Sequence, residues 1–229
     1  SVSVKPKVTG IYTTPGIPDN GLTTGDGVPN YSFTTMGFRT EINDNMSLAI
    51  IQDTPFGAEV DWTSGTSGYS FTGIKAKIES SATTALMSYD LDNVTVYGGL
   101  KNQSFSASAT NPLVGAKDGS NNVIGDGSGY SIASTTDSSI GYVFGVAFEK
   151  PEIAMRVALT YHSKVGHDVS IVEKVSGTTF AAALLSADTP ESLNLDFQTG
   201  IAANTLLFGT IRQVQWTQTK LSPTKYKIY

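Results

Sequence analysis

The sequence predicts an all-β protein, an antiparallel transmembrane β-barrel, on the basis of three observations. Apolar and polar residues alternate along long stretches of the 229-residue chain, which is the pattern of strands with one apolar and one polar face. The clearest stretches reach the roughly 9–11 residues that a tilted membrane-spanning strand needs. Short polar connections alternate with long ones rich in Gly, Ser, Thr and Asn, and outer-membrane barrels combine short periplasmic turns with long outer loops.

The first half of the chain supplies five predicted strands. Residues 2–8, 46–50, 74–78 and 94–100 show weak alternation. Residues 31–42 alternate with a slip of phase in the middle, as at a β-bulge.

The second half supplies four more strands, three of which have the clearest pattern in the chain. They cover residues 140–149, 155–165 and 192–202, and a weaker one lies near residues 206–216. The chain therefore holds about nine predicted strands. We expect the apolar side chains of the three clear strands to face acyl chains, and these include Tyr142, Phe144, Leu159, Leu195 and Phe197.

The predicted connections differ greatly in length. The long ones are residues 11–30, 63–70, 109–136 and 170–191. An unstructured loop as long as residues 109–136 would be unusual inside a compact soluble domain. The short turns cover residues 43–45, 90–93, 149–153 and 202–204.

Composition excludes several other classes of protein. The chain has no cysteine, which removes disulfides, thiolate metal sites and cysteine nucleophiles. The formal net charge is −5 and no basic cluster is present, so nucleic acid is not an expected partner. No run of about 18 apolar residues predicts a transmembrane helix, and barrel strands need no such run because they alternate.

Several segments, taken in order, resemble the FadL/TodX family of outer-membrane hydrophobic-compound transporters. Residues 156–165 (RVALTYHSKV) resemble the seventh-strand signature of this family, and residues 141–148 resemble the strand before it. Residues 192–195, followed by a strand–turn–strand ending at residues 215–217, continue the similarity. Upstream, residues 42–45 match the first periplasmic turn, and residues 54–58 fall where the third strand of the family is interrupted.

The resemblance implies a fourteen-stranded barrel with an N-terminal plug, outer loops that capture a hydrophobic ligand, and a sideways exit at a kink in the third strand. Two departures stand out, because no plug precedes the first predicted strand and the chain stops after about nine strands. An unclosed sheet cannot span lipid, since its edge groups would remain unpaired. We therefore expect residues 1–229 to be a single partial barrel domain that lacks the plug and the C-terminal strands. The alternative is that residues 225–229, which end in an aromatic residue, are a genuine last strand.

The interrupted third strand is the most informative local feature. Pro55 has no N–H for a strand ladder, and Gly57 adds backbone freedom. Alternation resumes at Ala58, which favours a kinked continuous strand over a strand that ends at Asp53 in a turn. The expected lateral opening consists of Thr54, Pro55, Phe56, Gly57 and Ala58.

Apolar residues in the long connections are candidates for ligand capture. Residues 180–185 have the composition of a short helix, and an apolar helix in an outer loop would cover a ligand or another loop. The two alternatives are a capture groove and simple packing between loops. The expected ligand-binding residues are Phe56, Leu113, Val114, Phe180, Leu184 and Leu185.

The sequence predicts no catalytic residues, no cofactor and no metal site. His162 and His167 are five residues apart, so on a regular strand they would point to opposite faces and could not bind one ion. Carboxylates are scattered through turns and loops, which leaves no glycosidase-type pair. An enzyme is therefore not expected.

The sequence predicts one preferred function and leaves two alternatives. The preferred function is passive uptake of hydrophobic small molecules, such as long-chain fatty acids or aromatic hydrocarbons, across the outer membrane of a Gram-negative bacterium. Outer-membrane lipid and lipopolysaccharide would surround the barrel, and nothing in the sequence predicts the oligomeric state. The alternatives are a secreted all-β adhesin and a general diffusion porin for polar solutes. Basic residues on the polar strand faces support the porin, namely Lys5, Lys7, Lys75, Lys77, Arg156 and Lys164.

Overall fold

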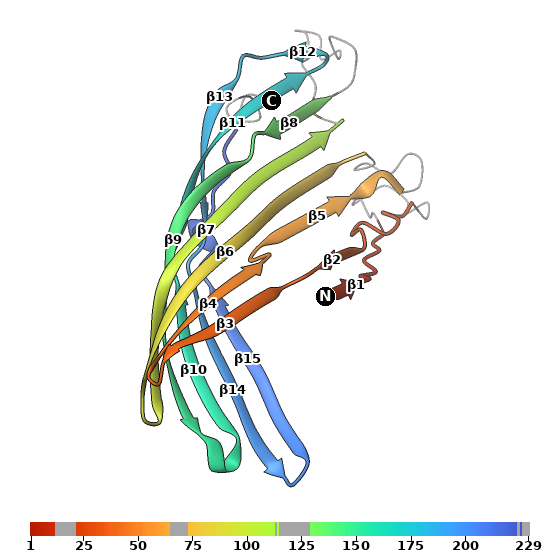
Figure 1. Cartoon of the computed structure of the whole chain (residues 1–229). Helices are drawn as coiled ribbons and strands as arrows, with labels where there is room; N and C mark the ends of the chain where they lie inside the picture. Colours follow the sequence, from red (N-terminus) through yellow and green to blue (C-terminus); the bar gives the residue numbers. More distant parts are fainter. Residues whose placement is uncertain (12–21, 65–72, 113, 115–128, 224, 226–229) are drawn as a thin grey trace.

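Strands make up nearly all of the regular structure in the computed structural model, which describes residues 1–11, 22–64, 73–112, 114, 129–223 and 225. Thirteen of them form one curved antiparallel sheet (Figure 1). A separate two-stranded sheet pairs β1 (Val2–Val4) with β2 (Tyr31–Phe33). Residues 2–8 therefore do not provide the first strand of the curved wall, because Val2–Val4 pair with β2 instead.

The strands of the wall follow one another in chain order. They are β3 (Met36–Asn43), β4 (Met46–Asp53), β5 (Gly57–Asp61), β6 (Lys75–Leu91), β7 (Val94–Asn111), β8 (Tyr130–Ser134), β9 (Asp137–Lys150), β10 (Met155–His162), β11 (Val165–Val175), β12 (Thr178–Thr179), β13 (Ala183–Thr189), β14 (Ser192–Ala202) and β15 (Thr205–Val214). Three short 3-10 helices complete the described structure, namely η1 (Trp62–Ser64), η2 (Pro151–Ile153) and η3 (Trp216–Gln218).

Several pairs of short strands follow each other along a single line of the sheet, with a short interruption between them. We call each such line, whether one strand or two, a stave of the wall. For example, β10 lies between β9 and β14, while its continuation β11 lies between β8 and β13. The staves are β3, β4 with β5, β6, β7, β8 with β9, β10 with β11, β13 with β14, and β15. Among the described residues, β3 and β15 each pair with a single neighbour, so the wall is a partial barrel. The predicted all-β antiparallel class is confirmed.

One end of the wall carries the tight turns. The hairpins β3–β4, β6–β7, β9–β10 and β14–β15 all turn at the end drawn lowest in Figure 1, where the sequence predicts its four short turns. Asp92 and Ala154 adopt positive φ angles of 50° and 49° in two of these turns. Much of the predicted long connections 11–30, 63–70 and 109–136 lies outside the described residues.

The predicted loop over residues 170–191 is wrong. β11 continues to Val175, a turn at Ser176 and Gly177 with positive φ angles reverses the chain, and β13 pairs back onto β11. The helix expected over residues 180–185 is wrong for the same reason. Helix propensity amounts to a few tenths of a kcal/mol per residue, and the ladder with β11 together with the packing of Leu185 outweighs it.

The outward face of the wall carries an apolar belt in the half nearest the tight turns. Register places Leu100 opposite Tyr142 and Gly98 opposite Phe144, and the four side chains Tyr142, Phe144, Leu100 and Leu159 are 42–62% exposed. Leu195 and Phe197 pair with Leu159 and Val157 and so share that face. We define the apolar belt as the outward-facing residues Met87, Tyr89, Leu91, Val96, Leu100, Tyr142, Phe144, Val146, Phe148, Val157 and Leu159.

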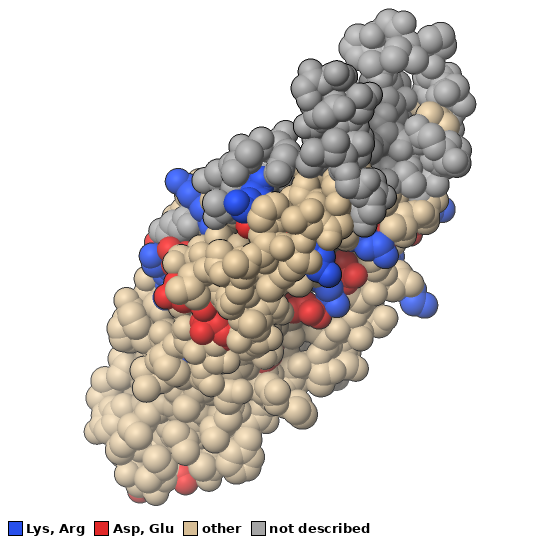
Figure 2. Space-filling view, turned by 90° about the horizontal axis from the view of Figure 1, so that it is seen from above, with Lys and Arg blue, Asp and Glu red and all other residues tan. Residues whose placement is uncertain are grey.

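Beyond the apolar belt the same outward face becomes polar. Ile78 packs into the interior, so its neighbours Lys77 and Glu79 point outward, and Ser81 and Ser104 share an outward hydrogen bond of 2.7 Å. Figure 2 shows Lys, Arg, Asp and Glu gathered over part of the surface, with a broad area almost free of them. This change from apolar to polar side chains along the outward face indicates where the hydrocarbon layer of the membrane would end.

The hydrophobic core lies on the inner side of the polar half. Phe105, Val169, Ile171 and Ala187 form its buried centre. Partly buried apolar side chains pack around them from β7, β13 and three further segments, namely Ile78, Ala107, Ile132, Ala183, Leu185 and Leu221. The inner side is therefore filled in one half and hollow in the other.

Candidate functional site

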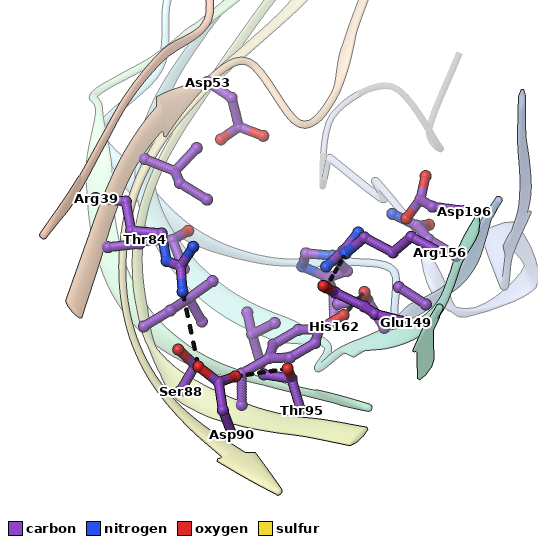
Figure 3. A pocket seen from close by; sticks show the side chains of 18 of the residues that line it. Arg39, Asp53, Thr84, Ser88, Asp90, Thr95, Glu149, Arg156, His162 and Asp196 are labelled. Carbon is purple, nitrogen blue, oxygen red and sulfur yellow. Dashed lines mark hydrogen bonds and ion pairs between the residues drawn. The ribbon is translucent and has the colours of Figure 1, made fainter. Parts of the chain in front are cut away.

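The hollow half of the wall encloses a cavity of about 700 Å³. Figure 3 shows Arg39, Asp53, Thr84, Asp90 and other polar side chains pointing into it from strands on both sides. They are the inward-facing members of strands whose outward-facing members form the apolar belt, because successive strand residues point to opposite faces. A polar interior behind an apolar belt is the arrangement of a membrane barrel lumen.

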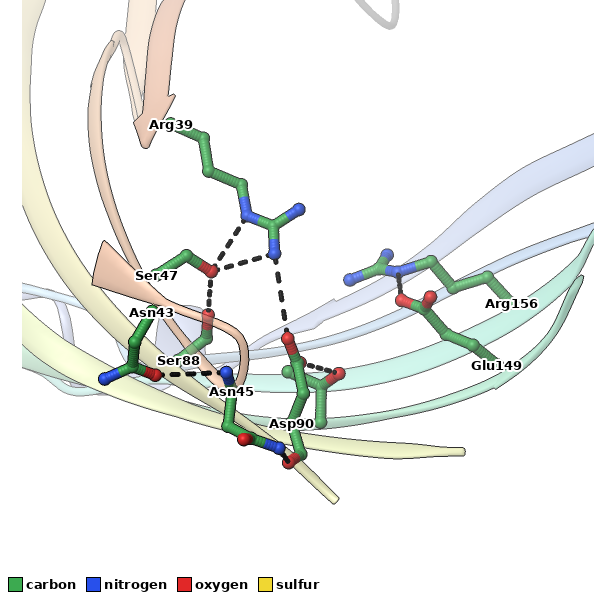
Figure 4. Close-up of polar contacts among 9 residues, drawn as sticks. Arg39, Asn43, Asn45, Ser47, Ser88, Asp90, Glu149 and Arg156 are labelled. Atoms are coloured by element: carbon green, nitrogen blue, oxygen red, sulfur yellow. Dashed lines mark hydrogen bonds and ion pairs between the residues drawn. The ribbon is translucent and has the colours of Figure 1, made fainter. Parts of the chain in front are cut away.

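One side of the cavity floor is organised around Arg39. Its guanidinium donates to Ser47 Oγ at 2.8 and 3.1 Å, and Ser47 Oγ lies 2.8 Å from Ser88 Oγ (Figure 4). Arg39 also pairs with Asp90 at 3.9 Å, and Asp90 accepts a hydrogen bond of 2.6 Å from Thr95. These contacts neutralise both charges and tie four neighbouring staves together, from β3 to β7.

The opposite side of the floor has a second ion pair and an aromatic contact. Arg156 Nε donates to Glu149 Oε1 at 2.9 Å, across the β9–β10 hairpin. Nearby, the Tyr97 ring covers Gly145, and its hydroxyl lies 2.6 Å from Thr160 Oγ1. The floor thus presents paired charges and bonded hydroxyls, which suits a water-filled lumen more than a catalytic site.

Both histidines lie on the inner side of the wall, so the prediction of opposite faces is wrong. His162 lines the cavity, whereas His167 is buried in the other half, 3.0 Å from Asp137 and stacked on Phe105. The phase of alternation slips at residues 163–164, between β10 and β11, and this turns His167 inward. In the part of the chain that the structure describes, no group of three potential metal ligands comes together.

The structure interrupts the third predicted strand at Thr54–Phe56. β4 ends at Asp53 opposite Ala82, and β5 begins at Gly57 opposite Glu79, so the interrupted stave has one residue more than β6. This is the geometry of a β-bulge. The strand therefore continues in the same stave after the break, as the sequence predicts, and does not end in a turn.

At the break, the Ser80 side chain takes the place of the missing ladder hydrogen bonds. Ser80 Oγ accepts a hydrogen bond of 3.0 Å from the Phe56 N–H and donates one to the Phe56 carbonyl. On the other edge, β3 ends its pairing at Met36 opposite Gln52, and β5 pairs with β6 alone among the described strands. Residues 54–58 thus form no ladder toward β3 in the described structure.

Phe56 is the apolar residue on the inner side of this break. It is 8% exposed, its ring lies 5.4 Å from the Trp216 ring, and the Arg212 guanidinium lies 5.0 Å above it. Arg212 also approaches the Pro55 carbonyl at 3.5 Å from 157 residues away in sequence. Nothing in the sequence pattern indicates these two partners.

The other expected ligand-binding residues lie at several places near the polar half. Leu185 packs against the core, and Phe180 is half-buried beneath the Lys225 ammonium group, which lies 4.7 Å from its ring. Val114 is also half-buried, whereas Leu184 is 79% exposed on the face opposite Leu185. Leu113 lies outside the described residues.

A partial barrel wall with an apolar belt and a polar interior defines this protein as an outer-membrane β-barrel protein. The family model described as outer membrane protein transport protein (OMPP1/FadL/TodX) matches residues 2–215, and the chain belongs to this family. The family places the protein in the outer membrane of a Gram-negative bacterium. The resemblance drawn from the sequence is confirmed.

The fold is also similar to a solved structure, a crystal structure of a Pseudomonas aeruginosa FadL homologue. The TM-score is 0.62 at 17% sequence identity, over 92% of this chain and 55% of that chain. The chain thus spans about half the length of that structure, and the likeness concerns the fold. A search of curated proteins finds no match. No helix among the described residues is long and apolar enough to cross a membrane.

Proposed function

We propose that this protein serves passive uptake of hydrophobic small molecules, such as long-chain fatty acids or aromatic hydrocarbons, with sideways release at residues 54–58. The observation that carries the proposal is the break in the wall between β4 and β5. It combines an extra residue, an edge without a ladder toward β3 and an apolar side chain, Phe56, on the inner side. The apolar belt faces lipid acyl chains on the outside of the wall, and these would receive a released hydrophobic ligand.

Capture would take place in the polar half of the wall, above the belt. Val114, Phe180 and Leu185 offer apolar surface there. Leu184 faces away from Leu185, and the expected residue Leu113 lies outside the described residues. Burial of apolar ligand surface contributes about 25 cal/mol per Å², which is enough to draw such a ligand from water without covalent chemistry. Binding followed by diffusion requires neither an enzyme nor a cofactor.

A general diffusion porin for polar solutes is the second candidate. The polar cavity of about 700 Å³ favours it. Of the basic residues that support a porin, however, Arg156 lines the cavity in an ion pair, whereas Lys75 and Lys77 pair with acidic side chains beside them on the polar outward face. The other alternative, a secreted adhesin, does not suit a family of the outer membrane.

Removal of the extra residue at the break tests the proposal. Deletion of Thr54 gives the interrupted stave as many residues as β6, which would let the ladder close. We expect cells that carry this variant to lose most uptake of radiolabelled long-chain fatty acid, while permeation of a small sugar stays unchanged. Thr54→Ala keeps the chain length and should keep uptake. Equal uptake by the deletion variant and the wild type would contradict sideways release at this break.

A further inference from the structure

The segment after β15 lies inside the wall and touches residues at both ends of the proposed ligand path. We define the inner strap as residues 216–223 together with Lys225. Leu221 packs against the core, and the Lys225 backbone N–H donates to Glu173 Oε1 at 3.1 Å. The Lys225 ammonium group lies over Phe180, and Trp216 lies against Phe56.

The two ends of the inner strap are held very differently. At the far end, Glu173 is 3% exposed and also accepts a hydrogen bond of 2.8 Å from the Tyr130 hydroxyl, so Lys225 is bound to a rigid group. At the near end, Trp216 is 56% exposed and begins a single 3-10 turn closed by the Thr219 N–H. A segment with few buried contacts opens locally at lower cost than its anchored end.

The near end covers the inner side of the break in the wall. Trp216 meets the Phe56 ring edge-on at an interplanar angle of 75°, and Arg212 covers the same ring as a cation–π partner. The Arg212 guanidinium also lies at hydrogen-bond distance from the Pro55 carbonyl, inside the break itself. Phe56 therefore remains buried although it lies where the wall has no complete ladder.

We propose that Arg212 and Trp216 form a latch that closes the break from the inside, and that the near end of the inner strap must move before a ligand reaches it. The latch rests on the proposed release at residues 54–58. Arg212 acts on Phe56 and the Pro55 carbonyl, and Trp216 acts on Phe56, so both are positioning residues that set how often the exit is open. Loss of either should raise the open fraction.

The first test measures transport. Cells carrying Trp216→Ala, Arg212→Ala or both should take up radiolabelled long-chain fatty acid faster than wild type, by roughly two- to tenfold, the range that one lost ring contact represents. Trp216→Phe keeps a ring and should restore the wild-type rate. Trp62→Ala removes the other tryptophan of the chain, in η1, and should have no effect. Uptake that stays at or below the wild-type rate in both latch variants would overturn the proposal.

The second test measures the latch without transport. The chain has no cysteine, so Pro55→Cys introduces a unique thiol at the break and keeps the Phe56 ring that the latch contacts. Its reaction with a water-soluble maleimide should be slow in the full chain and several-fold faster when Trp216→Ala is added. Should Trp216→Ala fold poorly, Arg212→Ala serves in the same comparison.

The two measurements separate the latch from the function on which it rests. Faster labelling in a protein that transports no fatty acid would support the latch and refute release at the break. Unchanged labelling in a protein that does transport would refute the latch and leave the release proposal standing. Unchanged labelling without transport would refute both.

Discussion

At the scale of single residues, the packing at some glycines depends on the absence of a side chain, because an aromatic ring fills the space. A Cβ on Gly145 would overlap the Tyr97 ring, which lies over this glycine and reaches Thr160 with its hydroxyl. Aromatic side chains commonly cover glycine across strands in this way, since the ring fills the missing side-chain volume. The same pairing recurs on the outward face, where Phe197 covers Gly209.

Gly145→Ala should therefore destabilise the wall. The added methyl group displaces Tyr97 and breaks its bond to Thr160, and overpacking of this kind costs about 1–3 kcal/mol. Urea unfolding of the protein in lipid vesicles measures the loss. Gly37→Ala is the matched control, because no atom beyond its two chain neighbours lies within 4 Å of the position its Cβ would take. Equal stability of the two variants would show that Tyr97 moves freely.

Ser80→Ala should loosen the break between β4 and β5. The Phe56 N–H and carbonyl would lose the hydroxyl that replaces their ladder, and unsatisfied buried groups cost about 1–3 kcal/mol. Hydrogen exchange of the Phe56 amide should become faster by the corresponding factor. Ser81→Ala, on the outward side of the same strand, removes only the bond to Ser104 and should leave this amide unchanged.

At the scale of elements, the staves change phase where the cavity gives way to the core. β8 and β9, β10 and β11, and β13 and β14 each join through two residues at which the alternation slips, as the break in β4 with β5 also does. A slip of one residue turns every following side chain to the other face. This explains why Val169 and Ile171 face the core although the pattern of β10 would place them outside.

The apolar belt makes a prediction about lipid contact. Phe144→Arg places a charge on the lipid face and should cost about 2–4 kcal/mol of unfolding free energy in vesicles, the range for a cation near the bilayer midplane. Ser104→Arg, outward on the neighbouring stave but beyond the belt, should cost much less. Similar losses for the two substitutions would mean that the belt does not mark the hydrocarbon layer.

At the scale of the whole molecule, the curvature of the sheet decides what lies inside it. Arg212, on the last stave, reaches Pro55 on the second, and Trp216 follows it to Phe56. Residues at distant points of the sequence thus share one interior, while the outward faces of the same staves contact lipid.

This orientation can be tested by fluorescence quenching. A tryptophan introduced as Phe144→Trp should be strongly quenched by brominated lipids, because it points from the belt into the acyl chains. The emission of native Trp216, inside the wall, should hardly change, and Trp62→Phe removes the other native signal. Strong quenching of Trp216 would contradict the placement of the inner strap.

Much of the fold could be predicted from the sequence because its signals are local. The alternation at residues 140–149 and 155–161 and the polar turn residues 43–45 specify strands, faces and hairpins through neighbours one or two positions apart. The upper part of β7 is hard to predict because its two faces differ little in hydrophobicity, with Ala107 and Ala109 on the inner face and Ser106 and Ser108 on the outer face. The β11–β13 hairpin was missed because the Ala-Leu run in residues 181–185 resembles a helix until β11 lies beside it.

The candidate site also combines features that could be predicted from the sequence with features that only the structure shows. The sequence by itself determined the class of protein, the outward belt and the position of the break at Pro55, because periodicity and the missing proline N–H act within a few residues. Only the tertiary structure decided that His167 faces inward and that Arg212 and Trp216 cover Phe56. It also decided that Leu185 packs against the core while Leu184 points away from it. These features depend on one-residue slips and on the curvature of the whole sheet, which arise from the sum of many pairings.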